Sequence, residues 1–332
     1  MDLAAGSGMP ALLTGMASML TYILRRLLTL VPVLLFVSAT VFLLIHLTPG
    51  DPAVIMAGES QDPVAVAGIR RELGLDQPIH VQYAIWLSHA VRGDLGKSIR
   101  TRQPVLEAML ERLRPTLELS VMAMALSLAI SFPVGMLSAI RPDSRQDKAG
   151  TVFALLGISM PNFLLALVLI FVFAVTLRWL PTSGYLDPFE ELVPGIRSLV
   201  LPAITLGTAM TAVVTRMVRS SLLEVLEQDY VRTARSKGLR ERTVLVRHAL
   251  KNALIPVVTI VGLQTGNLIG GAVITEYVFG IPGVGRLVVD SIFSKDYPMV
   301  QGVVLLTALA FVTANLLVDV IYGFLDPRIR YS

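Results

Sequence analysis

Six long apolar stretches constrain this chain more than any other feature of its sequence. A helix needs about 20 apolar residues to cross a hydrocarbon core of roughly 30 Å. Six stretches reach that length with charges only near their ends: residues 27–47, 117–140, 149–177, 199–218, 253–275 and 300–325. Hydrophobic residues make up 54% of the 332 residues and charged residues only 16%, as in integral membrane proteins. We therefore predict an all-α membrane protein with six transmembrane helices.

These stretches also divide the chain into segments. Residues 1–20 have no basic n-region or cleavage site, so we predict a disordered extension rather than a signal peptide. Residues 21–47 form the first transmembrane helix, and residues 48–116 form a helical loop domain outside the membrane. Residues 117–332 then hold five transmembrane helices, with a polar connection at about 219–251.

One motif in the 48–116 loop resembles a nucleotide site. Gly96, Lys97 and Ser98 match the end of the phosphate-binding loop G-x-x-x-x-G-K-[ST]. Val91 stands where the first glycine is required, and no apolar strand precedes it. We therefore expect a connection between helices here and no nucleotide site.

Basic residues predict the orientation of the chain, because cytoplasmic loops carry an excess of Lys and Arg. The stretch at 229–256 contains seven Lys or Arg residues, whereas the short loops on the opposite side contain few. Both termini are then cytoplasmic. The net charge of +4 is explained by this bias, so it is no argument for nucleic-acid binding.

The sequence offers no metal or catalytic centre. Cysteine is absent, which excludes disulfides and thiolate ligands. The four histidines are scattered, and no H-E-x-x-H motif occurs. We predict a subunit that is not itself an enzyme and has no metal site.

The basic stretch at 229–256 is predicted to be a short helix, a turn at Gly238 and a second helix entering the membrane. Glycine at this place is typical of a left-handed helix end. Val244, Leu245, His248, Ala249 and Asn252 would form one face of the second helix. Judged by their charge alone, the basic residues would orient the protein and contact anionic lipid headgroups. The helix, glycine turn and second helix together also suit docking to another protein.

This stretch, DYVRTARSKGL followed by RHALKNALIPVV, resembles the cytoplasmic loop of permease subunits of bacterial ATP-binding-cassette (ABC) importers of the dipeptide, oligopeptide and nickel type. Further matching pieces follow in order from residue 19: YILRRLL, LTPGDPA, LGLDQP, GDLGKS, RPTLEL, GISMPNF, WLPTSGY, LPAITLG, GGAVITEYVFGIPGVGRLVVDSI, KDYPMVQGVVLL and DPRIRY. LGLDQP and DPRIRY are most similar to the glutathione-importer branch. The wider superfamily has E-A-A-x-x-x-G, where this chain has Arg232, Thr233, Ala234 and Gly238, and Lys251 replaces a usual proline.

The resemblance implies a type I importer permease with six transmembrane helices, which is half of a permease heterodimer. Its partners would be a second permease subunit, two cytoplasmic ATPases that hold ATP and Mg²⁺, and an extracytoplasmic binding protein, with no cofactor in this chain. The residues that couple it to the ATPases would be Arg232, Ala234, Arg235, Gly238, Leu239, Arg247 and His248.

Polar residues inside the apolar stretches are candidates for the substrate path, because polar groups are costly in lipid. They are Asn162, Gln264 and Asn267. Helix-packing hydrogen bonds are the alternative for Gln264 and Asn267, since glycines surround them. Asn315 and Asp319 are expected to pair with neighbours instead.

A Gly- and Pro-rich segment follows the fifth apolar stretch, near the external mouth. We interpret it as an outer gate or a contact with the binding protein, with a purely structural turn as the alternative. Its candidate residues are Glu276, Phe279, Gly280, Pro282 and Gly283.

Three rival functions remain open from the sequence. A nickel-chelate permease would belong to the same family. An ion-coupled secondary transporter would carry membrane-buried charges and internal repeats, of which we find only Asp319 and no clear repeat. A membrane enzyme would need a catalytic cluster. The choice of peptide, glutathione or nickel chelate depends largely on a binding protein outside this chain.

Overall fold

The computed structural model of this chain describes residues 28–43, 53–54, 62–72 and 74–325. This part of the chain is helical, and its one isolated bridge joins Lys97 and Pro104. Within it, four helices are long and apolar enough to cross a membrane, or up to six if each of two bent pairs is one span. The all-helical prediction is confirmed for these residues, while the predicted number of six spans stays a prediction.

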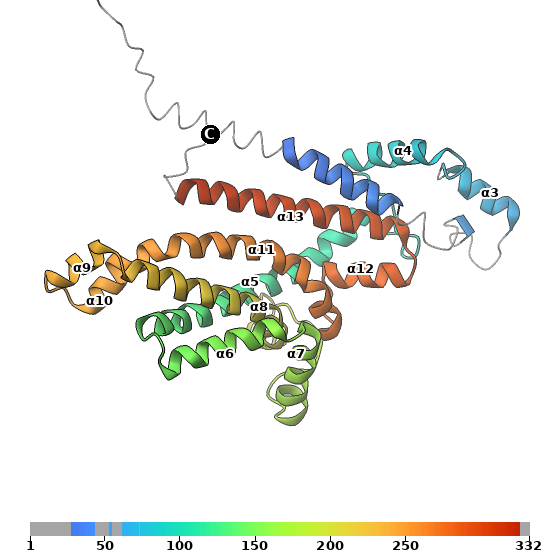
Figure 1. The fold of residues 1–332 in the computed structure, drawn as a ribbon. Helices are drawn as coiled ribbons and strands as arrows, with labels where there is room; N and C mark the ends of the chain where they lie inside the picture. The colour runs from blue at the N-terminus through green and yellow to red at the C-terminus, as the bar shows by residue number, and fades with distance from the viewer. Residues whose placement is uncertain (1–27, 44–52, 55–61, 73, 326–332) are drawn as a thin grey trace, which may run out of the picture.

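The core of the molecule is the packing of α5 (Val105–Ile140) on α8 (Leu192–Leu226), with α11 (Lys251–Phe279) and α13 (Tyr297–Leu325) alongside (Figure 1). Small residues let α5 and α8 approach closely. A Cβ on Gly207 would lie 2.8 Å from the carbonyl oxygen of Ala123, and one on Gly135 would lie 2.8 Å from that of Thr215. The backbones are therefore in direct contact at two levels.

The first predicted span is shorter in the described residues. Its helix runs from Leu28 to Leu43, and residues 27 and 44–47 lie outside the description, as does the 1–20 extension. The helix lies beside α4 (Ile79–Val91), because the Ser38 and Tyr83 hydroxyls are 2.8 Å apart and the Phe42 and Tyr83 rings meet edge to face.

The second span is longer than predicted. We predicted a helical loop domain up to residue 116 and a span at 117–140, but α5 is one helix that begins after Pro104 and runs through Pro115 and Pro133. Pro104 has the extended backbone of a helix N-cap. The freed backbone groups at internal prolines are tolerated where neighbouring helices and side chains replace the lost bonds.

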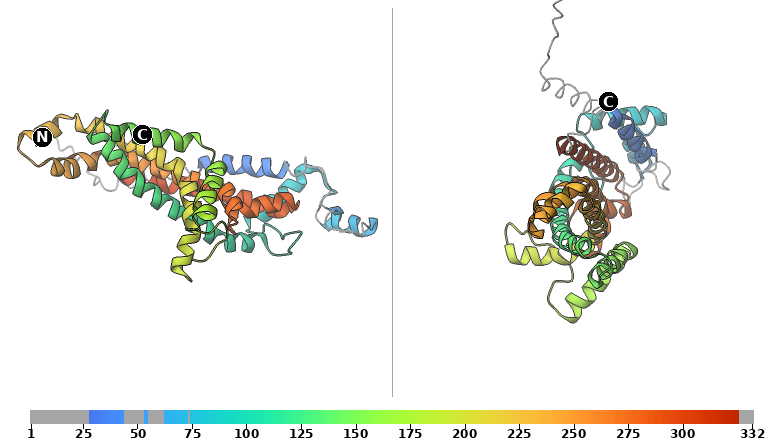
Figure 2. Two further views of the ribbon diagram at one scale, coloured as in Figure 1. Left: turned by 90° about the horizontal axis from the view of Figure 1, so that it is seen from below. Right: turned by 60° about the vertical axis from the view of Figure 1, so that its left-hand side comes forward.

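The third apolar stretch, predicted as one transmembrane helix at 149–177, is broken in the structure. It consists of α6 (Arg145–Ser159), α7 (Asn162–Leu169) and the π-helical η2 (Ile170–Thr176), with a bend of 109° between its halves. Pro161 excludes the helical conformation from the residue before it, and Met160 accordingly has ψ 124°. The second half projects from the side of the bundle (Figure 2).

The shorter helices lie at opposite ends of the bundle. At one end are α9 (Asp229–Ser236), α10 (Glu241–Thr243) and the π-helical η3 (Val244–Leu250). At the other are α3 (Pro63–Glu72), α4 and α12 (Val284–Phe293) (Figures 1 and 2). The two segments that the sequence singled out, the basic stretch and the Gly- and Pro-rich segment, are thus far apart.

Candidate functional site

The connection between α8 and α11 contains the basic stretch. Its helix α9 has Asp229 in the first turn and Arg235 in the last, where each charge interacts favourably with the helix dipole. The next residues turn at Gly238, whose φ of 75° lies in the left-handed region. A Cβ there would meet no atom within 4 Å, so the backbone conformation alone requires the glycine. The predicted glycine turn is present.

Helix α9 has one buried and one exposed face. Val231 and Ala234 pack against Val244, beneath the end of α8. Of the predicted coupling residues, Ala234 is therefore buried and His248 is half-buried, while the remaining ones are exposed: Arg232, Arg235, Gly238, Leu239 and Arg247. The exposed face combines positive charge with one leucine that is 40% exposed.

Two polar contacts tether this connection. Both guanidinium nitrogens Nε and Nη2 of Arg235 donate to the carboxylate of Glu241, at 3.2 and 2.6 Å. Nδ2 of Asn252 donates to the hydroxyl of Tyr230 at 2.8 Å. Both contacts are exposed, so water competes with them and each stabilises the fold only slightly.

The second helix of the basic stretch is not α-helical where we predicted it to be. Residues Val244–Leu250 form a π-helix, in which each backbone bond spans five residues. Val244 and Ala249 are five residues apart, and both are fully buried. The prediction from α-helical spacing placed Leu245, His248 and Asn252 on the same face as Val244 and Ala249. In the structure Leu245 and His248 are half-buried and Asn252 is exposed.

The Gly- and Pro-rich segment is a bend between α11 and α12 that closes on a buried carboxylate. Glu276 is 0% exposed. Its Oε1 accepts from the Thr116 hydroxyl at 2.6 Å, and its Oε2 accepts from the Arg286 N–H at 3.0 Å. The Thr116 oxygen in turn accepts from the Val284 N–H at 2.9 Å. Glu276 and Thr116 together satisfy free N–H groups in the first turn of α12.

The other predicted residues of this bend set its shape. Gly280 ends α11 with φ 68°, and its carbonyl accepts from Arg286 Nη1 at 2.9 Å. A Cβ at Gly283 would overlap the carboxyl group of Glu276. Phe279 is buried and Pro282 is half-buried. Glu276, Phe279 and Gly283 are therefore buried in protein, and Gly280, like Pro282, is half-buried.

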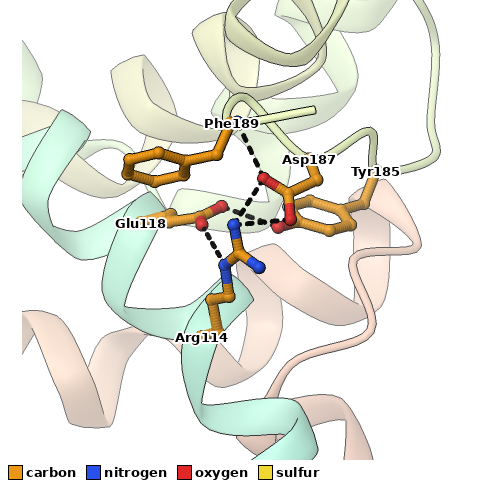
Figure 3. Close-up of polar contacts among 5 residues, drawn as sticks. All are labelled: Arg114, Glu118, Tyr185, Asp187 and Phe189. Carbon is orange, nitrogen blue, oxygen red and sulfur yellow. Dashed lines mark hydrogen bonds and ion pairs between the residues drawn. The ribbon is translucent and has the colours of Figure 1, made fainter. Parts of the chain in front are cut away.

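A cluster that the sequence analysis missed joins α5 to the loop before α8 (Figure 3). Arg114 Nε donates to Glu118 at 3.0 Å, its Nη2 lies 2.7 Å from Asp187, and its guanidinium covers the Phe189 ring at 5.2 Å. The Tyr185 hydroxyl donates to Glu118 at 2.6 Å. Burial, and then this hydrogen bond, raise the pKa of Tyr185, so its hydroxyl stays a donor. Only the four-residue spacing of Arg114 and Glu118 was visible in the sequence.

The segment that resembled a phosphate-binding loop is an anchor for the start of α5. Gly96 has φ 80°, and its N–H donates to Asp94 at 3.0 Å. This bond, and then the His89 ring, hold the pKa of Asp94 below its ordinary value. Beyond it, the Ser98 hydroxyl and the Ile99 N–H both bind the buried carboxylate of Asp296. The serine thus binds a carboxylate within the chain.

The candidate path residues lie on separate helices. Asn162 is half-buried at the start of α7, Gln264 is half-buried on α11, and the side chain of Asn267 lies outside the description, as does that of Asp319. Neither Asn162 nor Gln264 lines the apolar cavity of about 300 Å³ between α5, α6, α7 and α8. A Cβ at Gly266 would lie 2.8 Å from Phe311 and 3.1 Å from Asn315 Oδ1, so α11 packs closely on α13 here.

No group of three or more His, Cys, Asp or Glu side chains comes together in the described residues in a way that could hold a metal ion.

Comparison with known proteins decides the family. The family described as "Binding-protein-dependent transport system inner membrane component" matches residues 131–331, and its N-terminal counterpart matches residues 19–120. This chain belongs to that family. The prediction of an importer permease is confirmed, and the apolar helices and the family together indicate a multi-pass inner-membrane protein. The description of the family also implies a binding protein as a partner of the transport system.

Curated relatives of this inner membrane component align over nearly the whole chain. The glutathione transport system permease protein GsiC of Salmonella choleraesuis is 45% identical over 95% of this chain and 100% of its own length. The dipeptide transport system permease protein DppB of Alkalihalophilus pseudofirmus is 44% identical over 94% and 100%. A probable peptide ABC transporter permease protein, y4tP of Sinorhizobium fredii, is 44% identical over 93% and 99%.

Among solved structures, the inward-facing MetNI methionine ABC transporter matches the fold. Its chain aligns with a TM-score of 0.55 at 17% identity, over 66% of this chain and 96% of that one. At this identity the likeness concerns the fold alone.

Proposed function

We propose that this chain is a permease subunit of an ABC importer for dipeptides and oligopeptides, and that it forms half of the translocation pathway. Relatives named for glutathione, dipeptide and peptide transport, each 44–45% identical over more than nine-tenths of the chain, support this class of substrate. Glutathione is the narrower proposal, supported by the relative from Salmonella.

The observation that carries the proposal is the exposed basic face of α9 together with the Gly238 turn. In the proposed complex this face docks on a cytoplasmic ATPase through Arg232 and Arg235, together with Leu239 after the turn and Arg247 on η3. Positive charge complements an acidic surface and orients the two proteins. Ala234 acts from beneath, because it holds α9 against Val244 and the end of α8, while His248 is half-buried on η3.

The proposed partners follow from this arrangement. Two ATPases hold ATP and Mg²⁺, a second homologous permease subunit completes the pathway, and an extracytoplasmic binding protein delivers the peptide. Both termini lie in the cytoplasm, as the basic residues of the α8–α11 connection favour. This chain itself supplies no catalytic group.

The α11–α12 bend is proposed as part of the outer gate. Burial of Glu276 and Phe279 favours a role in shaping the gate over direct contact with the binding protein. Asn162, Gln264 and Asn267 remain proposed path residues. For the stretch of α11 that holds Gln264 and Asn267, the close approach of Gly266 to α13 also favours the alternative role in helix packing.

Reconstitution of the complex tests the proposed function. The tagged chain is purified with its co-expressed neighbours, placed in proteoliposomes with the binding protein, and assayed for uptake of labelled dipeptide and labelled glutathione with ATP or without it. We expect an ATPase to co-purify and uptake to require both ATP and the binding protein. Uptake that persists without ATP, or a preparation with no ATPase, would contradict the proposal.

A further inference from the structure

Asp147 and Arg219 form an ion pair between the start of α6 and the end of α8. Nε and Nη2 of Arg219 donate to the two carboxylate oxygens of Asp147 at 2.6 and 2.8 Å. Asp147 is only 3% exposed. A buried carboxylate is costly unless it is paired and hydrogen-bonded, and Arg219 supplies that partner here. Neither residue belongs to the α9 surface or to the α11–α12 bend.

The same carboxylate also holds the turn between α5 and α6. Its Oδ2 accepts from the backbone N–H of Asp143 at 3.0 Å, and Asp143 has φ 63°. Ser144 caps α6, because its hydroxyl oxygen accepts from the Asp147 N–H at 3.2 Å. One side chain therefore connects the turn, the first turn of α6 and the last turns of α8.

Close backbone packing makes these three helix ends a single block. A Cβ at Gly135 on α5 would overlap Val218 on α8, and one at Gly150 on α6 would lie 2.8 Å from the Ser138 hydroxyl on α5. Ala139 and Leu222 join the same contact. Such close contacts leave little room for the end of α8 to move independently of α5 and α6.

The end of α8 is also bonded to α11. The Ser221 hydroxyl donates to the carbonyl of Ala253 at 2.8 Å, and Leu222 packs on Ala249 and Ala253. At the end of α8, Arg219 therefore contacts the broken α6–α7 span and Ser221 contacts α11.

Helix α8 is separated from α9 by only Glu227 and Gln228. A force on α9 therefore acts directly on the segment that holds Arg219 and Ser221. We propose that the Asp147–Arg219 pair carries the movement of α9 into the α5–α6 arm, so that both side chains are positioning residues for energy coupling. This inference rests on the proposed function, in which α9 docks on an ATPase.

The chemistry of the pair suits transmission better than stability. An apolar pair of similar volume often replaces a buried ion pair with no loss of stability. A bidentate contact between guanidinium and carboxylate, by contrast, fixes both the distance and the orientation of the two helices. Lysine carries the same charge on one ammonium group at the end of a flexible side chain, so it does not fix the orientation of the two helices.

The test compares two substitutions of aspartate by asparagine, four residues apart, in the reconstituted complex. Asp147→Asn removes the buried carboxylate, whereas Asp143→Asn removes an exposed one at a left-handed position that asparagine tolerates. The readouts are peptide uptake and ATP hydrolysis in the same vesicles. We expect Asp147→Asn to lower the uptake per ATP by about tenfold, as is usual for coupling between sites. Asp143→Asn should have the same uptake per ATP as the wild type. The value for Arg219→Lys should lie between those of the wild type and Asp147→Asn.

Further variants separate coupling from folding and from the proposed function itself. If Asp147→Asn fails to assemble, the double variant Asp147→Asn with Arg219→Gln removes the unpaired charge and is measured in its place. An unchanged ratio of uptake to ATP in an assembled variant overturns the inference, and so does failure of both variants to assemble, because the pair would then only build the fold. If wild-type vesicles show no ATP-dependent uptake, the proposed function fails instead.

Discussion

The α11–α12 bend and the α8–α11 connection both turn through a left-handed glycine, yet different contacts hold them. At the bend, a Cβ on Gly280 would meet atoms of Arg286 and Ser183 within 3.8 Å, and a fully buried carboxylate lies beneath. At the connection, a Cβ on Gly238 would meet nothing within 4 Å, and the ion pair beside it is exposed.

This difference separates a fixed element from an adaptable one. A buried carboxylate that accepts several hydrogen bonds is costly to disturb, because each donor left without an acceptor loses free energy. An exposed ion pair contributes little to the free energy of unfolding. The bend is therefore part of the folded core, while the connection keeps its surface available to a partner.

The largest effect should come from Glu276→Ala, which breaks the fixed element. The Thr116 hydroxyl and the Arg286 N–H would lose their buried acceptor, so we expect the free energy of unfolding to fall by about 3 kcal/mol. Denaturant titration in detergent micelles measures this loss. The neighbouring, exposed Tyr277→Phe is the control; equal stability of the two variants would show that the carboxylate is not needed.

The second effect concerns the space at the bend. Gly283→Ala would push a methyl group into the Glu276 carboxyl group, and such overpacking costs about 2 kcal/mol. The matched variant is Gly68→Ala on α3, where a Cβ meets nothing within 4 Å. A smaller loss at Gly283 than at Gly68, by thermal unfolding, would contradict the close approach.

The third prediction moves to the connection and separates function from stability. Gly238→Val forces a β-branched residue into the left-handed region, which costs about 1–2 kcal/mol locally. We expect uptake to fall while the complex still assembles, because the turn no longer presents α9 correctly. Gly238→Asn should keep uptake, since asparagine adopts this conformation readily. Loss of uptake in both variants would mean that the residue's size, rather than its φ, matters.

The smallest effect should be that of Glu241→Gln. It weakens the exposed contact with Arg235, and the free energy of unfolding should change by less than about 0.5 kcal/mol. Chemical denaturation of the purified subunit measures it. A loss comparable to that of Glu276→Ala would remove the distinction between the two regions.

The sequence predicted features that depend on neighbouring residues. Apolar runs located the spans, and Gly238 located a turn, because the length of a helix and the sign of φ are local properties. The break at Met160 also has a local cause, which is Pro161. Prolines are common in membrane spans, however, and do not by themselves distinguish a kinked helix from a broken one.

The sequence could not predict contacts between distant residues. Thr116 and Glu276 are 160 positions apart, and Asp147 and Arg219 are 72 apart. Arg219 lies at the start of the polar connection predicted at about 219–251, and nothing near Asp147 marked that carboxylate as buried. The π-helix at Val244–Leu250 could not be predicted for another reason, because its sequence fits an α-helix equally well. Only the burial of Val244 and Ala249 in the folded structure distinguishes the two.

Helix α5 is longer than the membrane is thick. Its 36 residues extend about 54 Å, nearly twice the roughly 30 Å of a hydrocarbon core. One end bears the turn that Asp147 holds, and the other bears Val105 beside α12 and Arg114 beside the loop before α8. Residues at both ends therefore belong to one helix, which continues through Pro115 and Pro133 and packs on α8. The two ends of the bundle share this single structural element.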